Sequence, residues 1–152
     1  MRLTSESFLP GEAIPKAHAY SQGNVSPPLE WSGAPAGTKS FALICDDPDA
    51  PKAGGWVHWV LWNIPASASR LESGLPGKAE IAGGIRQGLN DWRELGWGGP
   101  EPPSGTHHYS FRIYALDIAP DERARLTRDS LMKLMQGHIL AQAELIGTFS
   151  AR

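Results

Sequence analysis

The sequence predicts a mainly β fold, a β-rich α+β domain built as a sandwich of sheets with short helices at one edge. Three segments, residues 39–45, 57–64 and 106–117, have the apolar, β-branched and aromatic composition of strands. The 17 glycines and 13 prolines alternate with these segments, which is typical of turns that join strands. Helical spacing occurs only after Pro120, and strands followed by helices indicate this fold class. A chain of 152 residues suits a single domain that spans residues 1–152.

The N-terminal part of the chain favours short strands separated by turns. Strand composition occurs around Leu3–Phe8 and again around His18–Ser21, with Pro-Gly and Ile-Pro turn signals between them. The Pro-Pro pair that begins at Pro27 has no backbone N–H to donate, so a loop or an edge strand is expected there. Leu29 and Trp31 would share the face that packs on the core.

Two segments have the composition of central strands. Residues 39–45 are largely apolar, and Val57–Ile64 is apolar on both faces, so other elements are expected to cover both faces of the second strand. Residues 66–88 are polar and rich in glycine. We interpret them as a surface connection with a weak strand or turn at Glu80–Ile85.

The second central strand carries one histidine, His58. Alternation places it on the face of Val60, Trp62 and Ile64. A histidine buried in a strand needs a hydrogen-bond partner. The nearest carboxylates along the chain are those of Asp47 and Asp49, which we expect to supply it.

The longest strand pattern runs from residue 106 to residue 117 and begins with two consecutive histidines. Because successive side chains point to opposite faces, His107 and Tyr109 are expected to point into the fold and His108 out of it. A second loop rich in proline and glycine, Gly98–Gly105, leads into this strand. Two such loops, each delivering a histidine to a strand end, predict one shared pocket.

Helical spacing after Pro120 predicts helices up to residue 147. The positions that follow this spacing are Leu131, Leu134, Met135, His138, Ile139, Gln142 and Leu145 or Ile146. Thr127 is a suitable N-cap, and Gly147 is a suitable end. Gly137 indicates a break into two short helices. A last strand over residues 147–151 is expected.

Composition excludes several classes of function. The net charge of −2 comes from 14 basic and 16 acidic residues without a basic stripe, so we expect no nucleic-acid partner. No window approaches 18 apolar residues and no signal peptide is evident, so we expect a cytoplasmic protein that does not insert into membranes. The single Cys45 lies in an apolar run and is interpreted as a core residue.

Residues of the two loops have the donors that bind a phosphoryl group. The Gly98–Gly105 loop can supply backbone N–H groups, Tyr109 a hydroxyl, and His58 and His107 imidazoles. An acidic neighbour such as Asp47 would favour protonation of a histidine. We therefore expect anion affinity to rise as the pH falls from about 8 to 6 through the histidine titration range.

Five motifs carry a resemblance to a known family. They are SPPLEW at 26–31, DPDAP at 47–51, GGWVHWVLWNIP at 54–65, GWGGPEPPSGTHHYSFRIYALD at 96–117 and GHILAQAELIGTF at 137–149. Together they resemble the phosphatidylethanolamine-binding protein (PEBP) family, in its bacterial Raf-kinase-inhibitor-like branch. This resemblance implies a Greek-key β-sandwich of largely antiparallel sheets with short C-terminal helices.

The resemblance also implies a phospholipid-related function, a small pocket for phosphate, phosphoethanolamine or a similar anionic group. Matched motif by motif, its ligand-binding residues are Asp47, Asp49, Trp56, His58, Pro103, His107 and Tyr109. It implies binding without catalysis, cofactor or metal, and regulation of a protein kinase or protease. Cis peptides are expected at Ala50–Pro51 and in the turn 54–56. A homodimer is also expected, with exposed Trp92 or Trp97 as candidates for its interface.

Two alternatives use the same histidines and aspartates. One is a metal-dependent enzyme with a two-histidine, carboxylate site for iron or zinc, although no HxH or HxxE spacing supports it. The other is a hydrolase that uses acid and base catalysis without a metal. Within the family pattern this chain departs at His108, where many relatives have arginine, and at Glu101, whose carboxylate would oppose a bound anion if it pointed inward.

Overall fold

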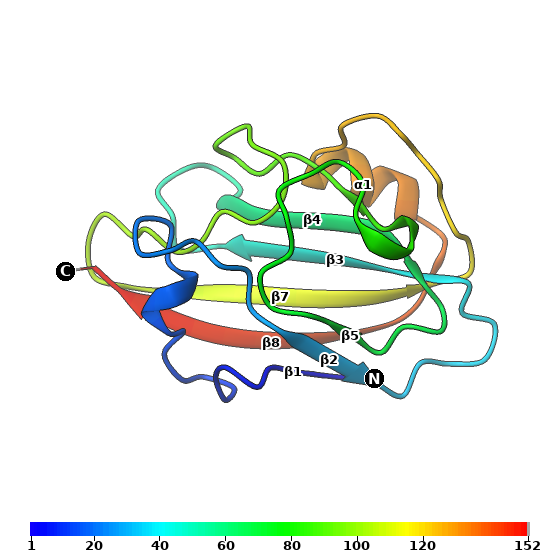
Figure 1. Ribbon diagram of the computed structural model, residues 1–152, viewed down its shortest axis with the longest axis horizontal. Helices are drawn as coiled ribbons and strands as arrows, with labels where there is room; N and C mark the ends of the chain where they lie inside the picture. Colours follow the sequence, from blue (N-terminus) through cyan, green and yellow to red (C-terminus); the bar gives the residue numbers. More distant parts are fainter. Residues whose placement is uncertain (152) are drawn as a thin grey trace.

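The computed structural model describes residues 1–151 and consists of two antiparallel β-sheets and one α-helix (Figure 1). The predicted domain therefore extends one residue beyond the described part, to Arg152. The strands are β1 (Arg2–Thr4), β2 (Leu29–Ser32), β3 (Ser40–Asp47), β4 (Trp56–Pro65), β5 (Arg70–Leu71), β6 (Arg86–Gln87), β7 (Thr106–Leu116) and β8 (Ile139–Ser150). The helix is α1 (Arg128–Met135), and short 3-10 helices lie at Lys16–His18 and Ala82–Gly84. The predicted mainly β fold class is confirmed.

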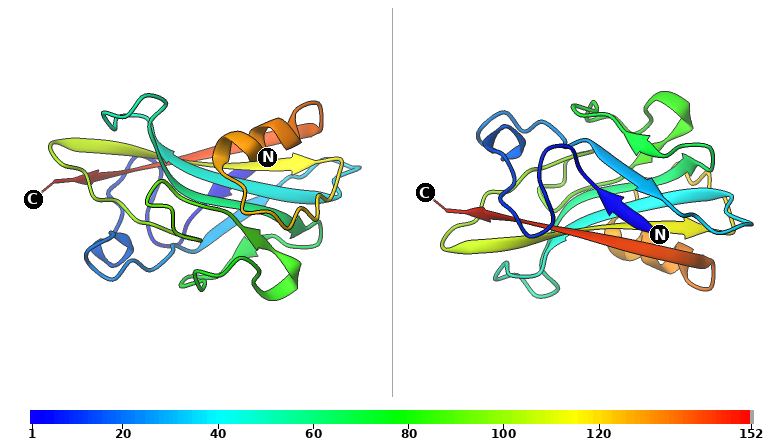
Figure 2. Two further views of the ribbon diagram at one scale, coloured as in Figure 1. Left: turned by 90° about the horizontal axis from the view of Figure 1, so that it is seen from above. Right: turned by 90° about the horizontal axis from the view of Figure 1, so that it is seen from below.

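The larger sheet has the strand order β6-β4-β3-β7-β8, and the smaller sheet has the order β1-β2-β5. The smaller sheet and α1 lie on opposite faces of the larger sheet (Figure 2). Every residue of β3 is buried, and so are most residues of β4, because both strands are covered on both faces. The two-sided cover predicted for the second central strand is confirmed. Among residues 1–151, no helix combines the length and apolarity needed to cross a bilayer.

Two apolar cores hold the layers together. The larger one lies between the sheets and joins Leu29 and Trp31 of β2 to Trp59 of β4 and Phe111 of β7. Leu29 and Trp31 therefore share the inward face, as predicted. The smaller core lies between the larger sheet and α1; it contains Ala42, Ile44, Val57, Val60, Trp62, Tyr114, Leu116, Leu131 and Met135.

Two β-bulges in β4 change which of its side chains share a face. The register between β3 and β4 shifts at two places, and β4 has one extra residue at each of them. One shift falls beside His58, whose ring consequently lies with Trp59 on the face toward the smaller sheet. Val60 and Trp62 face α1 instead. The sequence predicted that His58 shares a face with Val60, Trp62 and Ile64. Only Ile64 does so, because the bulges break the alternation of faces along the strand.

The predicted helices after residue 137 are wrong. Helix α1 ends at Met135, Gly137 follows with a φ of 82°, and residues 139–150 form β8, which pairs with β7 along almost its whole length. Alternate residues of β8 face the larger core, and a Cβ at Gly147 would lie 2.6 Å from Ile14 Cγ1. The apolar residues of this segment fit a strand as well as a helix. Pairing with β7 and burial against the larger core decided in favour of the strand.

Two N-terminal expectations also change. The strand expected at His18–Ser21 is wrong, because His18 ends a 3-10 helix and its ring bonds to the Val25 carbonyl (2.6 Å) and to Ser7 Oγ (3.1 Å). The first strand is shorter than expected and ends at Thr4. The segment 80–85, expected to be a weak strand or a turn, contains the short 3-10 helix Ala82–Gly84.

Helix α1 begins with the predicted N-cap. Thr127 Oγ1 accepts the N–H of Ser130 (3.3 Å), and Ser130 Oγ accepts the N–H of Thr127 (2.8 Å), which is a capping box. We expect Thr127→Ala to lower the free energy of unfolding by about 1 kcal/mol, since one helix N–H loses its acceptor. Urea denaturation measures this change. Thr127→Ser keeps the oxygen and should be close to wild type; equal losses in the two variants would contradict the capping role.

Candidate functional site

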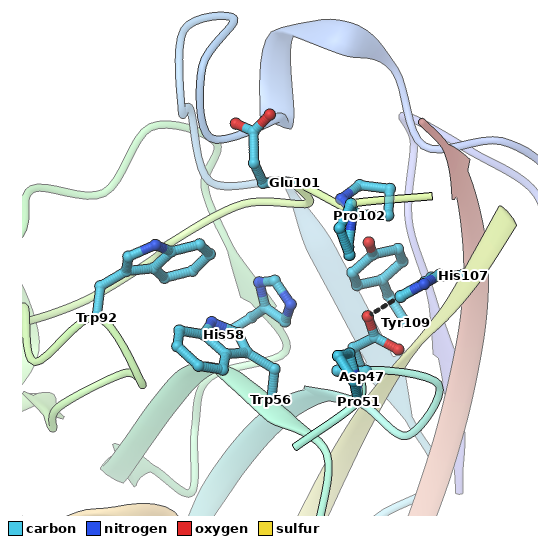
Figure 3. Close-up of a pocket in the computed structure, with 11 residues that line it drawn as sticks. Asp47, Pro51, Trp56, His58, Trp92, Glu101, Pro102, His107 and Tyr109 are labelled. Carbon is cyan, nitrogen blue, oxygen red and sulfur yellow. Dashed lines mark hydrogen bonds and ion pairs between the residues drawn. The ribbon is translucent and has the colours of Figure 1, made fainter. Parts of the chain in front are cut away.

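A pocket with a volume of about 260 Å³ lies where the β3–β4 loop, the start of β4 and the loop before β7 meet (Figure 3). Antiparallel pairing brings the end of β3 beside the starts of β4 and β7, which is why segments sixty residues apart share this pocket. Its lining residues are Asp47, Ala50, Pro51, Trp56, His58, Trp92, Glu101, Pro102, Pro103, His107 and Tyr109. Six of the seven predicted site residues are among them, and Asp49 is not.

Asp47 and His107 form a buried pair in the pocket wall. Asp47 ends β3 and His107 is the second residue of β7. The His107 Nδ1–H donates to Asp47 Oδ2 at 2.5 Å, and Asp47 Oδ1 accepts the backbone N–H of Asp49 at 2.8 Å. Both carboxylate oxygens therefore have partners. The predicted inward orientation of His107 and Tyr109 agrees with their burial, and His108 is exposed.

His58 has a different partner from the predicted carboxylates. Its Nδ1–H donates to the carbonyl oxygen of Gly98 at 2.5 Å, and the Gly98 N–H donates back to the His58 carbonyl at 2.9 Å. Because the Gly98 carbonyl oxygen can only accept, the ring hydrogen lies on Nδ1, and Nε2 is buried without a partner. Burial lowers the pKa of the imidazole below its ordinary value of 6.5, although the Gly98 carbonyl and Asp47 act in the opposite direction.

Two more polar atoms of the pocket are buried without partners, the Tyr109 hydroxyl and Trp56 Nε1. The rings of His58 and Tyr109 meet edge to face, with centroids 5.0 Å apart. Burial, with a smaller contribution from Asp47, raises the pKa of the Tyr109 phenol well above its usual range, so its hydroxyl remains a donor. Six buried side-chain atoms in the described residues have no partner, and three of them lie in this pocket. Such clustering indicates a place for a polar ligand.

Trp92 forms a wall of the pocket that sequence reasoning missed. Its ring stacks on Tyr20 (4.2 Å between centroids) and meets Trp56 edge to face (5.3 Å). The Tyr20 hydroxyl donates to Glu94 at 2.7 Å and holds this stack in place. The signal available in the sequence was the position of Trp92 in the glycine-rich segment before the second loop. Trp97, predicted to be exposed for a homodimer interface, is buried in the larger core, so that expectation is wrong for it.

Asp49 lies outside the pocket. Its Oδ2 accepts both the backbone N–H and the Nδ1–H of His108, each at 2.7 Å, and this side-chain bond lowers the pKa of the Asp49 carboxyl. The prediction of Asp49 as a lining residue is wrong. Alternation along β7 turns His108 to the outer side, and Asp49 bonds to His108 there. The contact ties the β3–β4 loop, which carries Ala50 and Pro51 in the pocket wall, to β7.

Glu101 lines the pocket mouth, but its carboxylate points away from the interior (Figure 3). Glu101 Oε1 accepts the Ser21 hydroxyl at 3.2 Å. None of the eleven lining residues is a lysine or arginine, and Asp47 and Glu101 are the two acidic residues among them. Among residues 1–151, no three His, Cys, Asp or Glu side chains converge as ligands for a metal ion.

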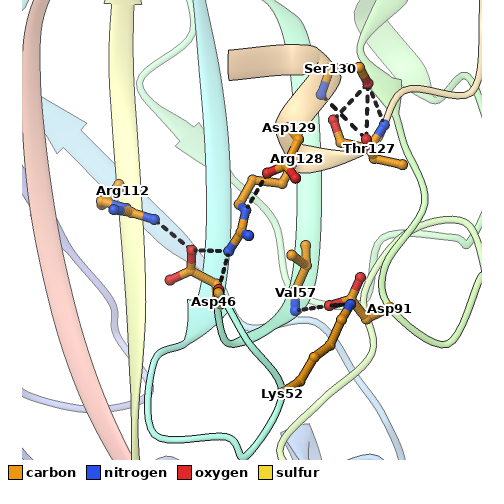
Figure 4. Close-up of polar contacts among 10 residues, drawn as sticks. Asp46, Lys52, Val57, Asp91, Arg112, Thr127, Arg128, Asp129 and Ser130 are labelled. Atoms are coloured by element: carbon orange, nitrogen blue, oxygen red, sulfur yellow. Dashed lines mark hydrogen bonds and ion pairs between the residues drawn. The ribbon is translucent and has the colours of Figure 1, made fainter. Parts of the chain in front are cut away.

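A second polar network, on the α1 side of the sheet, holds the β3–β4 loop in place (Figure 4). Asp46 Oδ2 accepts from Arg112 (2.7 Å) and Arg128 (3.1 Å), and Arg128 also donates to the Gly54 carbonyl (2.9 Å). Lys52 pairs with Asp91 (3.0 Å) in the segment before Trp92.

The turn that closes the β3–β4 loop contains two glycines with positive φ, Gly54 (80°) and Gly55 (79°). A Cβ at Gly55 would lie 2.5 Å from the Asp47 carbonyl oxygen, so the turn requires glycine there. All described peptide bonds are trans, and the cis peptides expected at Ala50–Pro51 and in this turn are wrong.

Comparisons with known proteins agree with this fold. The profile of the family described as Phosphatidylethanolamine-binding protein matches residues 4–150. A UPF0098 protein of Methanothermobacter thermautotrophicus is 44% identical over 149 residues, with 98% of each chain covered. YbhB of Escherichia coli is 37% identical over 158 residues, covering 99% of this chain and 100% of YbhB. The crystal structure of Escherichia coli YbcL matches with a TM-score of 0.91 and 35% identity, covering 99% of this chain and 98% of YbcL. The chain therefore belongs to the phosphatidylethanolamine-binding protein family, on the branch of YbhB and YbcL.

Proposed function

We propose that the protein binds a small ligand through a phosphoryl or similar anionic group held in this pocket. The observation that carries the proposal is the cluster of three buried, unpartnered polar atoms, on Trp56, His58 and Tyr109, beside the Asp47–His107 pair. A buried polar atom without a partner costs about 1–3 kcal/mol. A ligand that supplied all three partners would recover that cost on binding.

The donors for an anion come from side chains more than from the loop backbone. Trp56 Nε1–H and the Tyr109 hydroxyl are free to donate. The loop N–H groups expected for this purpose are partly used within the fold, since Gly98 donates to His58 and Gly99 to Asn24 Oδ1 (2.8 Å). Side-chain donors set in a rigid, largely aromatic pocket suit a small phosphoryl group.

The geometry favours binding without turnover. The residues that line the pocket include no serine, threonine, cysteine or lysine to act as a nucleophile. The candidates for a general base are His58 and His107. The Nδ1 atoms of both are already bonded, to the Gly98 carbonyl and to Asp47. The Asp47 carboxylate has a partner at each oxygen, and the raised pKa of the Tyr109 phenol keeps it protonated, so neither is an activated nucleophile. We therefore favour a binding protein over the acid and base hydrolase.

The test is an amide-resolved NMR titration with phosphoethanolamine and, separately, inorganic phosphate. We expect saturable shifts around residues 47–58 and 98–109. Tyr109→Phe should weaken binding about tenfold or more, because one hydrogen bond to a charged group is lost. Its thermal stability should be equal to or above that of wild type, since the deleted hydroxyl is buried without a partner.

Tyr114→Phe is the matched control, because Tyr114 lies on the same strand, buried on the opposite face against α1. It should bind both ligands as wild type does. Absence of shifts at millimolar ligand, or equal losses in the two tyrosine variants, would contradict the proposed pocket. Regulation of a kinase or protease, and a homodimer, stay predictions from the family resemblance.

A further inference from the structure

His58 presents a hydrogen-bond acceptor, not a donor, to the pocket. Its Nδ1 carries the hydrogen that is donated to the Gly98 carbonyl at 2.5 Å, and its Nε2 is buried and unpartnered. Burial lowers the pKa of this imidazole, so the neutral ring persists near pH 7. A bound group that meets Nε2 must therefore bring its own hydrogen.

We infer that the pocket selects a phosphoryl group that carries a proton, with its P–OH donating to His58 Nε2. This inference rests on the proposed phosphoryl pocket and names its ligand class. Phosphate monoesters qualify because their second ionisation lies at about pH 6, and inorganic phosphate qualifies because its second ionisation lies about one pH unit higher. Both therefore supply a monoanion that carries P–OH near neutral pH. A phosphodiester, such as the headgroup linkage of an intact phospholipid, has no P–OH to donate.

The charges around the pocket favour the same ligand form. Asp47 on β3 and Glu101 in the loop before β7 are carboxylates, and no lysine or arginine lines the cavity. Asp46, on the opposite face of β3, is paired with Arg112 and Arg128. The Glu101 carboxylate points away from the interior (Figure 3). A nearby cation, Lys52, lies over the Trp56 ring and is paired with Asp91. A dianion would therefore lie beside the Asp47 carboxylate with no lysine or arginine in the lining, whereas a monoanion brings less charge and one more donor.

The other polar groups of the pocket do not supply the hydrogen that His58 Nε2 needs. The Tyr109 hydroxyl and Trp56 Nε1–H are donors, which suit the unprotonated phosphoryl oxygens. His107 donates through Nδ1 to Asp47. Of the three unpartnered atoms, only His58 Nε2 calls for a donor. His58 is therefore a specificity-determining residue, because its Nε2 favours a ligand that carries a proton over one that does not.

The test compares matched ligands by isothermal titration calorimetry at pH 6 and pH 8. Phosphoethanolamine is the monoester and glycerophosphoethanolamine is the diester with the same amine; inorganic phosphate and fully ionised sulfate form the second pair. We expect phosphoethanolamine to bind about fifty times more tightly at pH 6 than at pH 8, in proportion to its monoanion fraction. Inorganic phosphate, whose second ionisation lies about one pH unit higher, should bind roughly sevenfold more tightly at pH 6 than at pH 8 by the same proportion. The diester and sulfate should bind at least about tenfold more weakly at pH 6, because each lacks one hydrogen bond.

His58→Asn tests the assigned atom. The asparagine amide can still donate to the Gly98 carbonyl but has no group in place of Nε2. It should reduce phosphate affinity at pH 6 to the level of sulfate. His138→Asn, at a partly exposed histidine paired with Asp117 away from the pocket, should keep the wild-type preference. If His58→Asn fails to fold, the wild-type ligand series decides the question alone.

Each contrary result has a distinct meaning. Equal affinity for phosphate and sulfate, or for the monoester and the diester, overturns the inference and leaves the phosphoryl pocket intact. A diester that binds as well as its monoester would point to the ammonium as the donor to Nε2. Sulfate binding that strengthens in parallel with phosphate on acidification would place the proton on a histidine of the protein and also overturn it. No binding of any of the four ligands overturns both the inference and the proposed function.

Discussion

We expect His107→Ala to lower the free energy of unfolding by about 3–5 kcal/mol, because it leaves the Asp47 carboxylate buried without its main partner. The Asp47 side chain is only 4% exposed, and the lost bond is the 2.5 Å contact between His107 Nδ1 and Asp47 Oδ2. The N–H of Asp49 remains as the one bond to this carboxylate. Urea denaturation with intrinsic tryptophan fluorescence measures the loss.

His108→Ala is a matched control one residue away. It breaks a bond of nearly the same geometry, to Asp49 at 2.7 Å, but both side chains of this pair are largely exposed, 57% for the histidine and 41% for the aspartate. The expected loss is below about 1 kcal/mol, because water replaces the partner. Similar losses in the two variants would mean that burial does not distinguish the pairs and would contradict the account of the pocket wall.

Trp59→Ala should destabilise the protein by a similar amount, about 3–5 kcal/mol, through the cavity it leaves between the sheets. Trp59 is fully buried and packs edge to face on Trp97, with centroids 5.4 Å apart. Its Nε1–H donates to Gln87 Oε1 at 2.8 Å, and Gln87 in turn donates to the carbonyls of Pro76 and Lys78. The substitution therefore also leaves a buried acceptor without its donor.

Two variants separate these contributions. Trp59→Phe keeps an aromatic ring but removes the donor to Gln87, so its loss should be clearly smaller than that of Trp59→Ala. Trp92→Ala removes a half-buried ring from the pocket wall and should cost less stability than Trp59→Ala while weakening ligand binding. Thermal and urea denaturation of the three variants give the order. A loss for Trp92→Ala as large as that for Trp59→Ala would contradict this assignment of wall and core.

Sequence reasoning succeeded where a strand is regular. β7 pairs with β8 without a shift from residue 106 to residue 115, so alternation correctly placed His107 and Tyr109 inward and His108 outward. Its pairing with β3, over residues 110–116, is also without a shift. It failed on β4, because bulges change the face of a side chain and arise from pairing that the strand's own residues do not reveal. It failed on β8 for a related reason, since its apolar residues fit a helix as well as a strand.

The sequence by itself determined the fold class, the family, and six of the side chains that line the pocket, because local motifs and strand composition carry that information. Only the tertiary structure decided how those side chains are paired. The partner of His58 is the carbonyl of Gly98, forty residues away, and not a nearby aspartate. Asp49 joins His108 outside the pocket, and Trp92 enters its wall. Hydrogen bonds between distant segments form only when the strands have paired, and they decide which atoms remain free for a ligand.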